Sequence, residues 1–483
     1  MSADMSGLFD DPHQALTRLT RLAGRRDEAE RWLADAFERN LEKLAPVALD
    51  VAVETGDPVG KVLANRLQSS AAVEVAERLM RRCNGVGPLT PTTWREVALE
   101  STRQCLLVRR TALGSEPNEE DYAELARITM NLGNRYHELG RRENALRFGA
   151  EAIEIQRRLA AERPSVYLWD LAKGLSNQCI RHAIQGRWRE ALAAVREAVD
   201  IQRREVAERP GASHLDFAAS LDNLGIILSE LNRPEEALEA NREAVEIRRG
   251  HLGDHPGSLP LLAGSLANLA GRLKELGRED EALEAIRESV DLRRQLAANE
   301  PNTHLPDLAR SLHNLGNVLG GLERHEEACE VSREAVDVRR RLVRERPDAF
   351  RADLARSLRS LGLRLRALDR REGALGALRE SVDIRRRLEA DHRGAVRYDL
   401  AAGLQDLGLV LNDLGREEEA VASFREAIDL RRQLARERPA VVLPELEESF
   451  YELITTLYRL GRRDEARAAV EQRGSVLGAI DGR

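Results

Sequence analysis

The stretch PDLARSLHNLGNVLGGLERHEEACEVSREAVDVRRRL, residues 306–342, determines the fold of this chain. Apolar residues recur at helical spacing in both of its halves. They are Leu308, Leu312, Leu315, Leu319, Ala328, Ala335, Val336 and Leu342. Pro306 is expected in the first turn of the first helix, where its missing N–H is harmless. That helix is expected to end near Glu323. The stretch therefore predicts a helical hairpin.

The same pattern returns along most of the chain. The turn between paired helices is expected at Gly140, Gly186, Asn232, Gly277, Glu323, Asp369, Gly415 and Gly461, at intervals of 46 residues with one of 45. Gly, Asn and Asp tolerate a left-handed helix end, and Glu323 is the poor fit. Prolines are expected in the loops between units, at Pro164, Pro210, Pro256, Pro301, Pro347 and Pro439, with Arg393 in the remaining place. The period predicts an all-α solenoid of eight hairpins over residues 121–483.

Small residues mark where the two helices of a hairpin meet. Every unit has alanine at one position of its second helix: Ala145, Ala191, Ala237, Ala282, Ala328, Ala374, Ala420 and Ala466. Small residues also recur at one position of the first helices: Gly133, Gly225, Ala270, Gly316, Gly362 and Gly408. Glycine inside a helix costs about 1 kcal/mol relative to alanine. The recurrence therefore predicts close approach of the second helix.

The composition fits a thin repeated core. Aromatic residues make up 4% of the chain and charged residues 33%, with a net charge of −7. This balance lacks the basic excess of a nucleic-acid-binding protein. The four cysteines are scattered, the N-terminus lacks the pattern of a signal peptide, and no apolar run is long enough to span a membrane. A cytoplasmic protein without nucleic-acid or membrane partners is expected.

Two repeats carry a recognisable signature. In the first repeat it comprises Leu132, Gly133, Tyr136, Ala145 and Ala152, and in the seventh Leu404, Leu407, Gly408, Leu411, Ala420, Phe424 and Ala427. This pattern resembles the tetratricopeptide repeat (TPR). The long unit and the phrases LxNLG and EAVxIRR are similar to the kinesin-light-chain type, which is widespread in bacterial multi-repeat proteins. The resemblance covers about three quarters of the chain. It implies a superhelix whose concave groove binds a protein or peptide.

Residues 1–120 are less regular. A degenerate hairpin is expected over residues 13–45, further helices over 46–83, and a lone helix of the second type over 92–113. Turn-rich breaks are expected at 83–91 and 114–121. Either a cap for the solenoid or a small separate module is consistent with this pattern.

A row of amides is the main candidate for recognition. A helical wheel places one position of the first helix opposite the packed side, and it reads Asn131, Asn177, Asn223, Asn268 and Asn314, then Ser360, Asp406 and Glu452. An amide both donates and accepts hydrogen bonds, so the row can pair with the backbone of an extended peptide. The resemblance implies the same, because kinesin-light-chain-like arrays have Asn at this position. Alternatively, the asparagines were inherited with the duplicated unit and bridge neighbouring helices.

Charged residues accompany this row. Arg127, Asn134 and Lys173 are expected near the start of the groove. Arg310, Arg356, Arg359 and Arg366 are expected to form a basic wall with few compensating acids, followed by Asp406 and Asp413. Such a wall would bind an acidic segment of the partner. Alternatively, these charges are simply solvated.

Other signals predict no chemistry. GDPVGK (56–61) is one residue short of a phosphate loop and has Val62 in place of the magnesium-binding hydroxyl. His251 and His255 lie in a loop sequence, and His182 is expected in the core. The second helices are expected to have internal i, i+4 ion pairs, as in Arg333, Asp337 and Arg341 or Arg379, Asp383 and Arg387. The chain is expected not to be an enzyme and to need no metal or cofactor.

Two functions are consistent with these features. The first is a protein- or peptide-binding scaffold that uses the groove. The alternative is a regulatory peptide sensor whose N-terminal helices relay binding, with an effector such as an NTPase or a protease bound in trans. The sensor hypothesis lacks a recognisable output module in this sequence.

Overall fold

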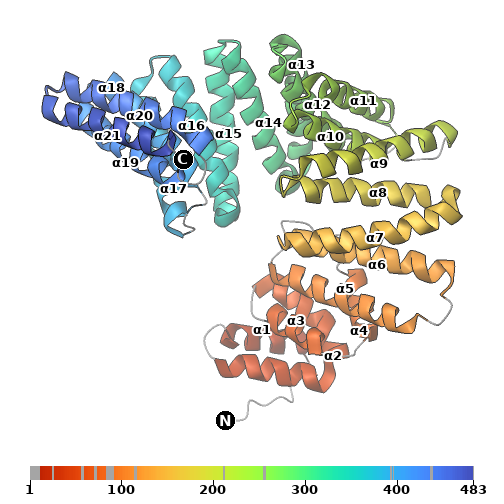
Figure 1. Cartoon of the computed structure of the whole chain (residues 1–483). Helices are drawn as coiled ribbons and strands as arrows, with labels where there is room; N and C mark the ends of the chain where they lie inside the picture. The colour runs from red at the N-terminus through yellow and green to blue at the C-terminus, as the bar shows by residue number, and fades with distance from the viewer. Residues whose placement is uncertain are drawn as a thin grey trace. The chain divides into compact units, whose positions relative to one another are not determined.

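The computed structural model describes residues 11–481 apart from short gaps at 24–26, 56–58, 70–72, 83–91, 114–116, 210–212, 254–256, 392–393, 395 and 436–438. The described residues form 21 helices and no strand. They divide into two compact units, Met1–Ala244 and Val245–Arg483. Within each unit, consecutive helices pack against each other as an all-α solenoid (Figure 1).

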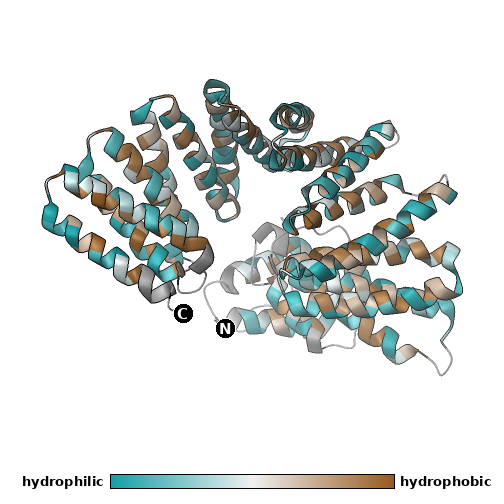
Figure 2. Cartoon of the chain, turned by 45° about the horizontal axis from the view of Figure 1, so that its top comes forward, coloured by the Kyte–Doolittle hydropathy of each residue, from teal (hydrophilic) through white to brown (hydrophobic). Residues whose placement is uncertain are grey.

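Eight helical hairpins follow one another at the predicted register. Their helices are α6 (Glu119–Glu138) with α7 (Arg142–Glu162), α8 (Pro164–Ala183) with α9 (Trp188–Glu208), α10 (His214–Glu230) with α11 (Pro234–Gly250), α12 (Ser258–Glu275) with α13 (Glu279–Asn299), α14 (Pro301–Gly321) with α15 (His325–Glu345), α16 (Pro347–Ala367) with α17 (Arg371–Asp391), α18 (Arg397–Asp413) with α19 (Glu417–Ala435), and α20 (Pro439–Arg459) with α21 (Arg463–Asp481). Brown apolar and teal polar residues alternate along these helices (Figure 2). One side of each helix is thus available for packing.

The turns within the hairpins are confirmed. All eight predicted turn residues have positive φ, between 56° and 74°. Glu323 adopts this conformation too, with φ of 58°, although a side chain makes it unfavourable. The surrounding helix pair therefore imposes the turn at this position.

The expectation for the prolines is wrong in part. Pro164, Pro301, Pro347 and Pro439 are the first residues of their helices, not loop residues. Proline fits this place because its φ is preset and its missing N–H would have no helical partner. Pro306 consequently lies inside α14. Because Pro306 has no N–H, the carbonyl of Asn302 lacks its usual helical partner. Asn302 is exposed to solvent. Pro210, Pro256 and Arg393 lie outside the described residues.

The close packing within hairpins is confirmed. The eight alanines are at most 1% exposed. A methyl group built on Gly408 would lie 2.5 Å from the ring of Phe424, and one on Gly362 would lie 2.6 Å from Leu378. A methyl group built on Gly133 would lie 3.2 Å from the backbone nitrogen of Gly149. The second helix therefore leaves no room for a side chain at these positions.

The N-terminal helices precede the hairpins without a repeat of the same length. They are α1 (Pro12–Ala23), α2 (Asp27–Thr55), α3 (Val59–Ser69), α4 (Val73–Arg82) and α5 (Thr92–Ala112). Helix α1 packs on α2, and α5 packs on α6. A kink at Asn40 interrupts α2. The expected break at 83–91 lies outside the described residues, as do residues 114–116 of the break expected at 114–121, within which α6 already begins at Glu119. The boundary at residue 120 stays a prediction.

The second helices are joined between repeats by ion pairs. Their arginines reach glutamates forty residues later, in the next second helix: Arg157–Glu197, Arg203–Glu243, Arg287–Glu327, Arg294–Glu334, Arg340–Glu380, Arg379–Glu419 and Arg386–Glu426, at 2.5–2.9 Å. The prediction of i, i+4 pairs is therefore wrong for Arg379, whose partner is Glu419. A helical wheel shows one helix only, whereas the long arginine side chain spans the gap to the next. Such exposed pairs each contribute little, about 0–1 kcal/mol.

Candidate functional site

Within each unit, first helices of neighbouring repeats contact each other, as α8 and α10 do in one and α14 and α16 in the other. Their side chains meet at a spacing of 47 residues, one position further along the helix in the next repeat. Ser176 of α8 accepts a hydrogen bond from Asn223 of α10 at 3.3 Å, and Arg359 of α16 pairs with Asp406 of α18 at 2.5 Å. We call the surface formed by these side chains the first-helix face.

The predicted row of asparagines lies on this face. Asn131, Asn177, Asn223, Asn268 and Asn314 are all half-buried. Asn223 bridges to the neighbouring helix, as the alternative interpretation expects. The structure gives the other four no hydrogen-bond partner among the described residues. Their amides therefore remain available for recognition, which stays a prediction.

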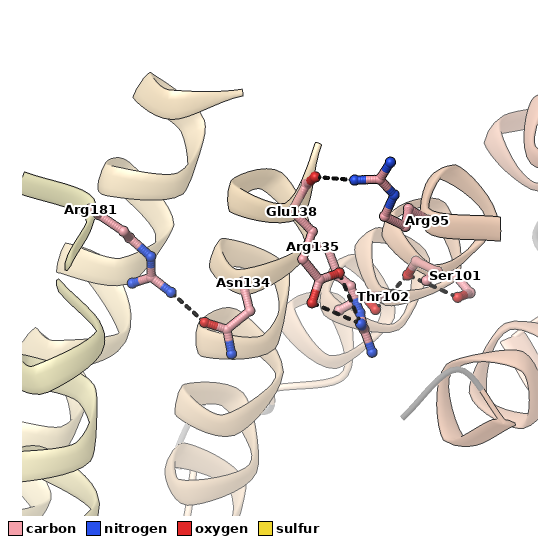
Figure 3. A network of polar contacts seen from close by, with 8 residues as sticks. Arg95, Ser101, Thr102, Asn134, Arg135, Glu138 and Arg181 are labelled. Atoms are coloured by element: carbon pink, nitrogen blue, oxygen red, sulfur yellow. Dashed lines mark hydrogen bonds and ion pairs between the residues drawn. The ribbon is translucent and has the colours of Figure 1, made fainter. Parts of the chain in front are cut away.

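Asn134 has a fixed orientation. The buried guanidinium of Arg181 donates a hydrogen bond to its Oδ1 at 2.6 Å, from α8 to α6 (Figure 3). Burial lowers the pKa of Arg181 to about 10, so this residue remains charged at neutral pH. Since the oxygen of Asn134 is engaged, its Nδ2 group is the part left to donate to a ligand.

A pocket of about 700 Å³ opens between α6, α7 and α8. Asn131 and Asn177 of the asparagine row line it, so the structure brings them together with Arg127, Asn134 and Lys173, the three residues predicted near the start of the groove. Its apolar wall consists of Met130, Leu159 and Tyr167. The volume is in the range of small-molecule and peptide side-chain pockets. We call it the α6–α8 pocket.

The buried wall of this pocket differs from the same place in later repeats. Here it has Gln156 of α7 and Gly174 of α8. The register-equivalent pairs are Gln202 and Ser220, Arg248 and Ser265, Arg293 and Ser311, Arg339 and Ser357, Arg385 and Gly403, and Arg431 and Ser449. In the second unit, Arg293 fills this space and donates to Ser311 at 2.7 Å and to the carbonyl of Asp307 at 2.6 Å. A shorter side chain and a missing side chain thus leave the α6–α8 pocket open.

Two of the arginines that replace Gln156 in later repeats, Arg293 and Arg339, are buried without contacting a carboxylate. Each is at most 4% exposed, and burial lowers the pKa of both to about 10. Their positive charge is met by backbone carbonyls and serine hydroxyls instead. These residues join one repeat to the next.

The predicted basic wall is wrong in its charge balance. Arg310 pairs with Asp307 at 2.7 Å and Arg356 with Asp353 at 3.0 Å. Arg359 pairs with Asp406, and Arg366 pairs with Asp413, each at 2.5 Å. Every one of the four arginines therefore has a carboxylate partner. A helical wheel does not show these pairs, because each acid belongs to the preceding turn or to the next repeat.

Arg310 and Arg356 do share a small pocket. It measures about 180 Å³ and is also lined by Arg339 and Phe350. Arg359 and Arg366 contact acids of α18 and do not line it. Burial raises the pKa of Asp406 while Arg359 opposes that shift. The four residues thus divide into two pairs.

Sequence reasoning missed the residues that shape the α6–α8 pocket. Gln156, Gly174, Glu120 and Asp170 were not singled out, although all four line it. A usable signal was present, because aligning the repeats shows Gln together with Gly here, whereas every later pair has Arg, Ser or both. Departure from the repeat pattern, and not agreement with it, marks this site.

The titratable groups give little indication of catalysis. Burial raises the pKa of the Cys105 and Cys179 thiols to about 12, which disfavours the nucleophilic thiolate. Burial also lowers the pKa of His182, which lies half-buried beside the turn of its hairpin. Within the described ranges, no group of three or more His, Cys, Asp or Glu could hold a metal ion. The same ranges contain no helix that is long and apolar enough to cross a membrane. His255 and residues 56–58 of the GDPVGK segment lie outside them.

Comparison with protein families identifies the repeat. Residues 170–250 and 307–387 match one model described as a tetratricopeptide repeat. Residues 125–162, 262–299 and 400–435 match a second model of that description, and 450–472 a third. Together the matches cover more than half of the chain. The chain belongs to the tetratricopeptide-repeat family. As a TPR protein it is, in general class, a protein-interaction scaffold.

Several solved structures are similar to this TPR chain, and RapI shares its fold. The apo form of RapI has a TM-score of 0.51 at 13% identity, with 84% of this chain and 99% of that one covered. A Rap protein complexed with competence and sporulation factor has a TM-score of 0.45 at 12% identity, with 87% and 99% covered. BtubC (BKLC) from P. vanneervenii has a TM-score of 0.43 at 19% identity, with 51% and 92% covered. Comparison with curated proteins gives no match.

Proposed function

We propose that this TPR protein binds an extended peptide segment of a partner protein on its first-helix face. The observation that carries the proposal is the α6–α8 pocket, which gathers Asn131, Asn134 and Asn177 in one concave site. Amides of this kind can donate to and accept from a peptide backbone of any sequence. We also propose that the protein acts in the cytoplasm and not as an enzyme.

The test uses variants that leave the fold intact. Asn131 and Asn177 make no hydrogen bond within the described residues, so Asn131→Ala with Asn177→Ala should preserve the thermal midpoint. Each lost hydrogen bond is worth about 0.5–1.5 kcal/mol, so partner binding should weaken about tenfold. Arg294→Ala with Glu334→Ala, on exposed second helices, is the matched control.

A partner captured from native lysate and identified by mass spectrometry supplies the ligand. Titration of the purified partner against the three proteins should separate the asparagine variant from both others. Equal affinity of all three for that partner would exclude the first-helix face as the binding surface. An acidic segment is the competing ligand class. It is disfavoured because it would have to displace the carboxylates that pair with the four arginines.

One contact supports the sensor as a second candidate. Arg109 of α5 pairs at 2.5 Å with Glu124 of α6, and Glu124 lines the α6–α8 pocket. Ligand binding at this pocket can therefore alter a contact of the N-terminal helices. Hydrogen exchange in residues 92–112, measured with and without the captured partner, should change if those helices relay binding and stay constant if they do not.

A further inference from the structure

One buried polar atom in the α6–α8 pocket lacks a partner. Gln156 is 8% exposed, and its Oε1 atom accepts no hydrogen bond. An unmet buried acceptor of this kind is unfavourable. A ligand that donates an N–H here would remove the penalty, whereas a ligand carboxylate would add repulsion.

The atom lies beside two other residues that line the pocket, Gly174 and Met130. A methyl group built on Gly174 would lie 2.4 Å from Oε1 of Gln156 and 3.0 Å from the end of Met130. The acceptor therefore sits between the apolar wall of α6 and the bare backbone of α8. A linear aliphatic side chain with a donor at its tip has the shape and chemistry for this position.

The charges around the pocket favour a cation. Both basic residues that line it are already paired, Arg127 with Glu124 at 3.5 Å and Lys173 with Asp216 at 3.3 Å. Glu120 and Asp170 also line it and have no ion pair among the described residues. Buried Arg181 lies behind the wall, where Asn134 and Gln178 engage it. The charges left without a partner at the pocket are thus two carboxylates.

We infer that the α6–α8 pocket binds a lysine or arginine side chain of an extended peptide segment. Its terminal N–H donates to Oε1 of Gln156, its aliphatic stem packs on Met130 and Leu159, and Glu120 and Asp170 balance its charge. This inference rests on the proposed function and adds the chemistry of the partner. It replaces the acidic ligand expected from the sequence with a basic one.

The experiment measures fluorescence anisotropy of labelled nonapeptides against the full chain. The peptides share one serine–alanine–threonine background, have blocked ends, and differ only in a central Lys, Arg, Gln, Leu or Glu. The Lys or Arg peptide should bind about tenfold more tightly than the Leu or Glu peptide. Equal binding of all five, tightest binding of the Glu peptide, or binding of none would overturn the inference.

A closing variant tests the location. Gln156→Arg with Gly174→Ser rebuilds the pair that Arg293 and Ser311 form, so this protein should fold and retain its thermal midpoint. Its affinity for the Lys or Arg peptide should fall about tenfold or more, as should that of Glu120→Gln with Asp170→Asn. Arg310→Gln, in the second unit, is the control and should bind as wild type does.

These outcomes are separable from the proposed function. If the closing variant binds the basic peptides like wild type, the pocket assignment is wrong whatever the captured partner does. A different outcome is that the captured partner binds wild type more tightly than the asparagine variant, as proposed, while no basic peptide binds. In that case the first-helix face stands as the binding surface and the preference for a cation fails.

Discussion

Replacing Gly408 by alanine tests the close packing on which every hairpin depends. A methyl group there would lie 2.5, 2.7 and 2.8 Å from three ring atoms of Phe424, which is fully buried. The ring cannot turn away without disturbing the hydrophobic core of α18 to α21. Overpacking of this kind costs about 1–3 kcal/mol, and alanine returns about 1 kcal/mol of helix propensity. Net destabilisation of about 0–2 kcal/mol is expected.

Gly376→Ala is the matched control. Gly376 lies inside α17, is exposed, and has nothing within 4 Å of a built methyl group. Only the propensity gain applies there, so this variant should be stabilised by about 1 kcal/mol. The two variants should therefore differ by about 1–3 kcal/mol, or roughly 2–12 °C in thermal midpoint for a unit of this size.

The assay is thermal and urea unfolding of the full chain, followed by circular dichroism. Phe424→Leu combined with Gly408→Ala should cost less than the sum of the single changes, because the smaller side chain makes room for the methyl group. If Gly408→Ala stabilises as much as Gly376→Ala, the helices do not approach as closely as the packing requires, and the reasoning from interior glycines is refuted.

Two further outcomes are expected. Glu323→Gly should raise stability by about 1 kcal/mol in urea titrations, because φ of 58° strains a residue with a side chain, and unchanged stability would show that the turn is unstrained. Burial lowers the pKa of His313 to about 4. In the unfolded chain His313 therefore takes up a proton near pH 6.5, whereas in the folded chain it stays neutral at that pH. Stability should thus fall as the pH drops from about 6.5 towards 4, and less steeply in His313→Gln; parallel pH profiles would contradict this.

The repeated features of the fold could be predicted from the sequence because they are local. A turn needs a left-handed residue, and a tight helix pair needs alanine or glycine, so Gly140 and Ala145 identify a hairpin without knowledge of its neighbours. Pro306 shows the limit of this reasoning. Two prolines five residues apart each suit a helix start, and local sequence does not distinguish them; α14 begins at Pro301.

Contacts between repeats could not be predicted in the same way. The spacing of 47 residues on first helices and of 40 on second helices depends on how one hairpin stacks on the next. A helical wheel therefore placed Arg359 and Asp406 on one face without showing that they neutralise each other at 2.5 Å. The asparagine row was placed on the correct helices, but the pocket around Asn131 arises from Gln156 and Gly174, which the search for shared residues passed over.

One position in the repeat can serve either stacking or recognition, and its side chain decides which. An arginine there reaches the next first helix, as Arg293 does, and its charge requires the carbonyl and hydroxyl that fill the space. A glutamine is shorter and neutral, so an unmet hydrogen bond costs it less than it would cost a buried charge, and Gln156 keeps one acceptor free beside Gly174. The hairpins on either side are still joined by helix packing and by pairs such as Arg157 with Glu197. A solenoid can therefore exchange one internal link for a binding pocket without losing its stacking, which is why the closing variant should remain folded while it loses its ligand.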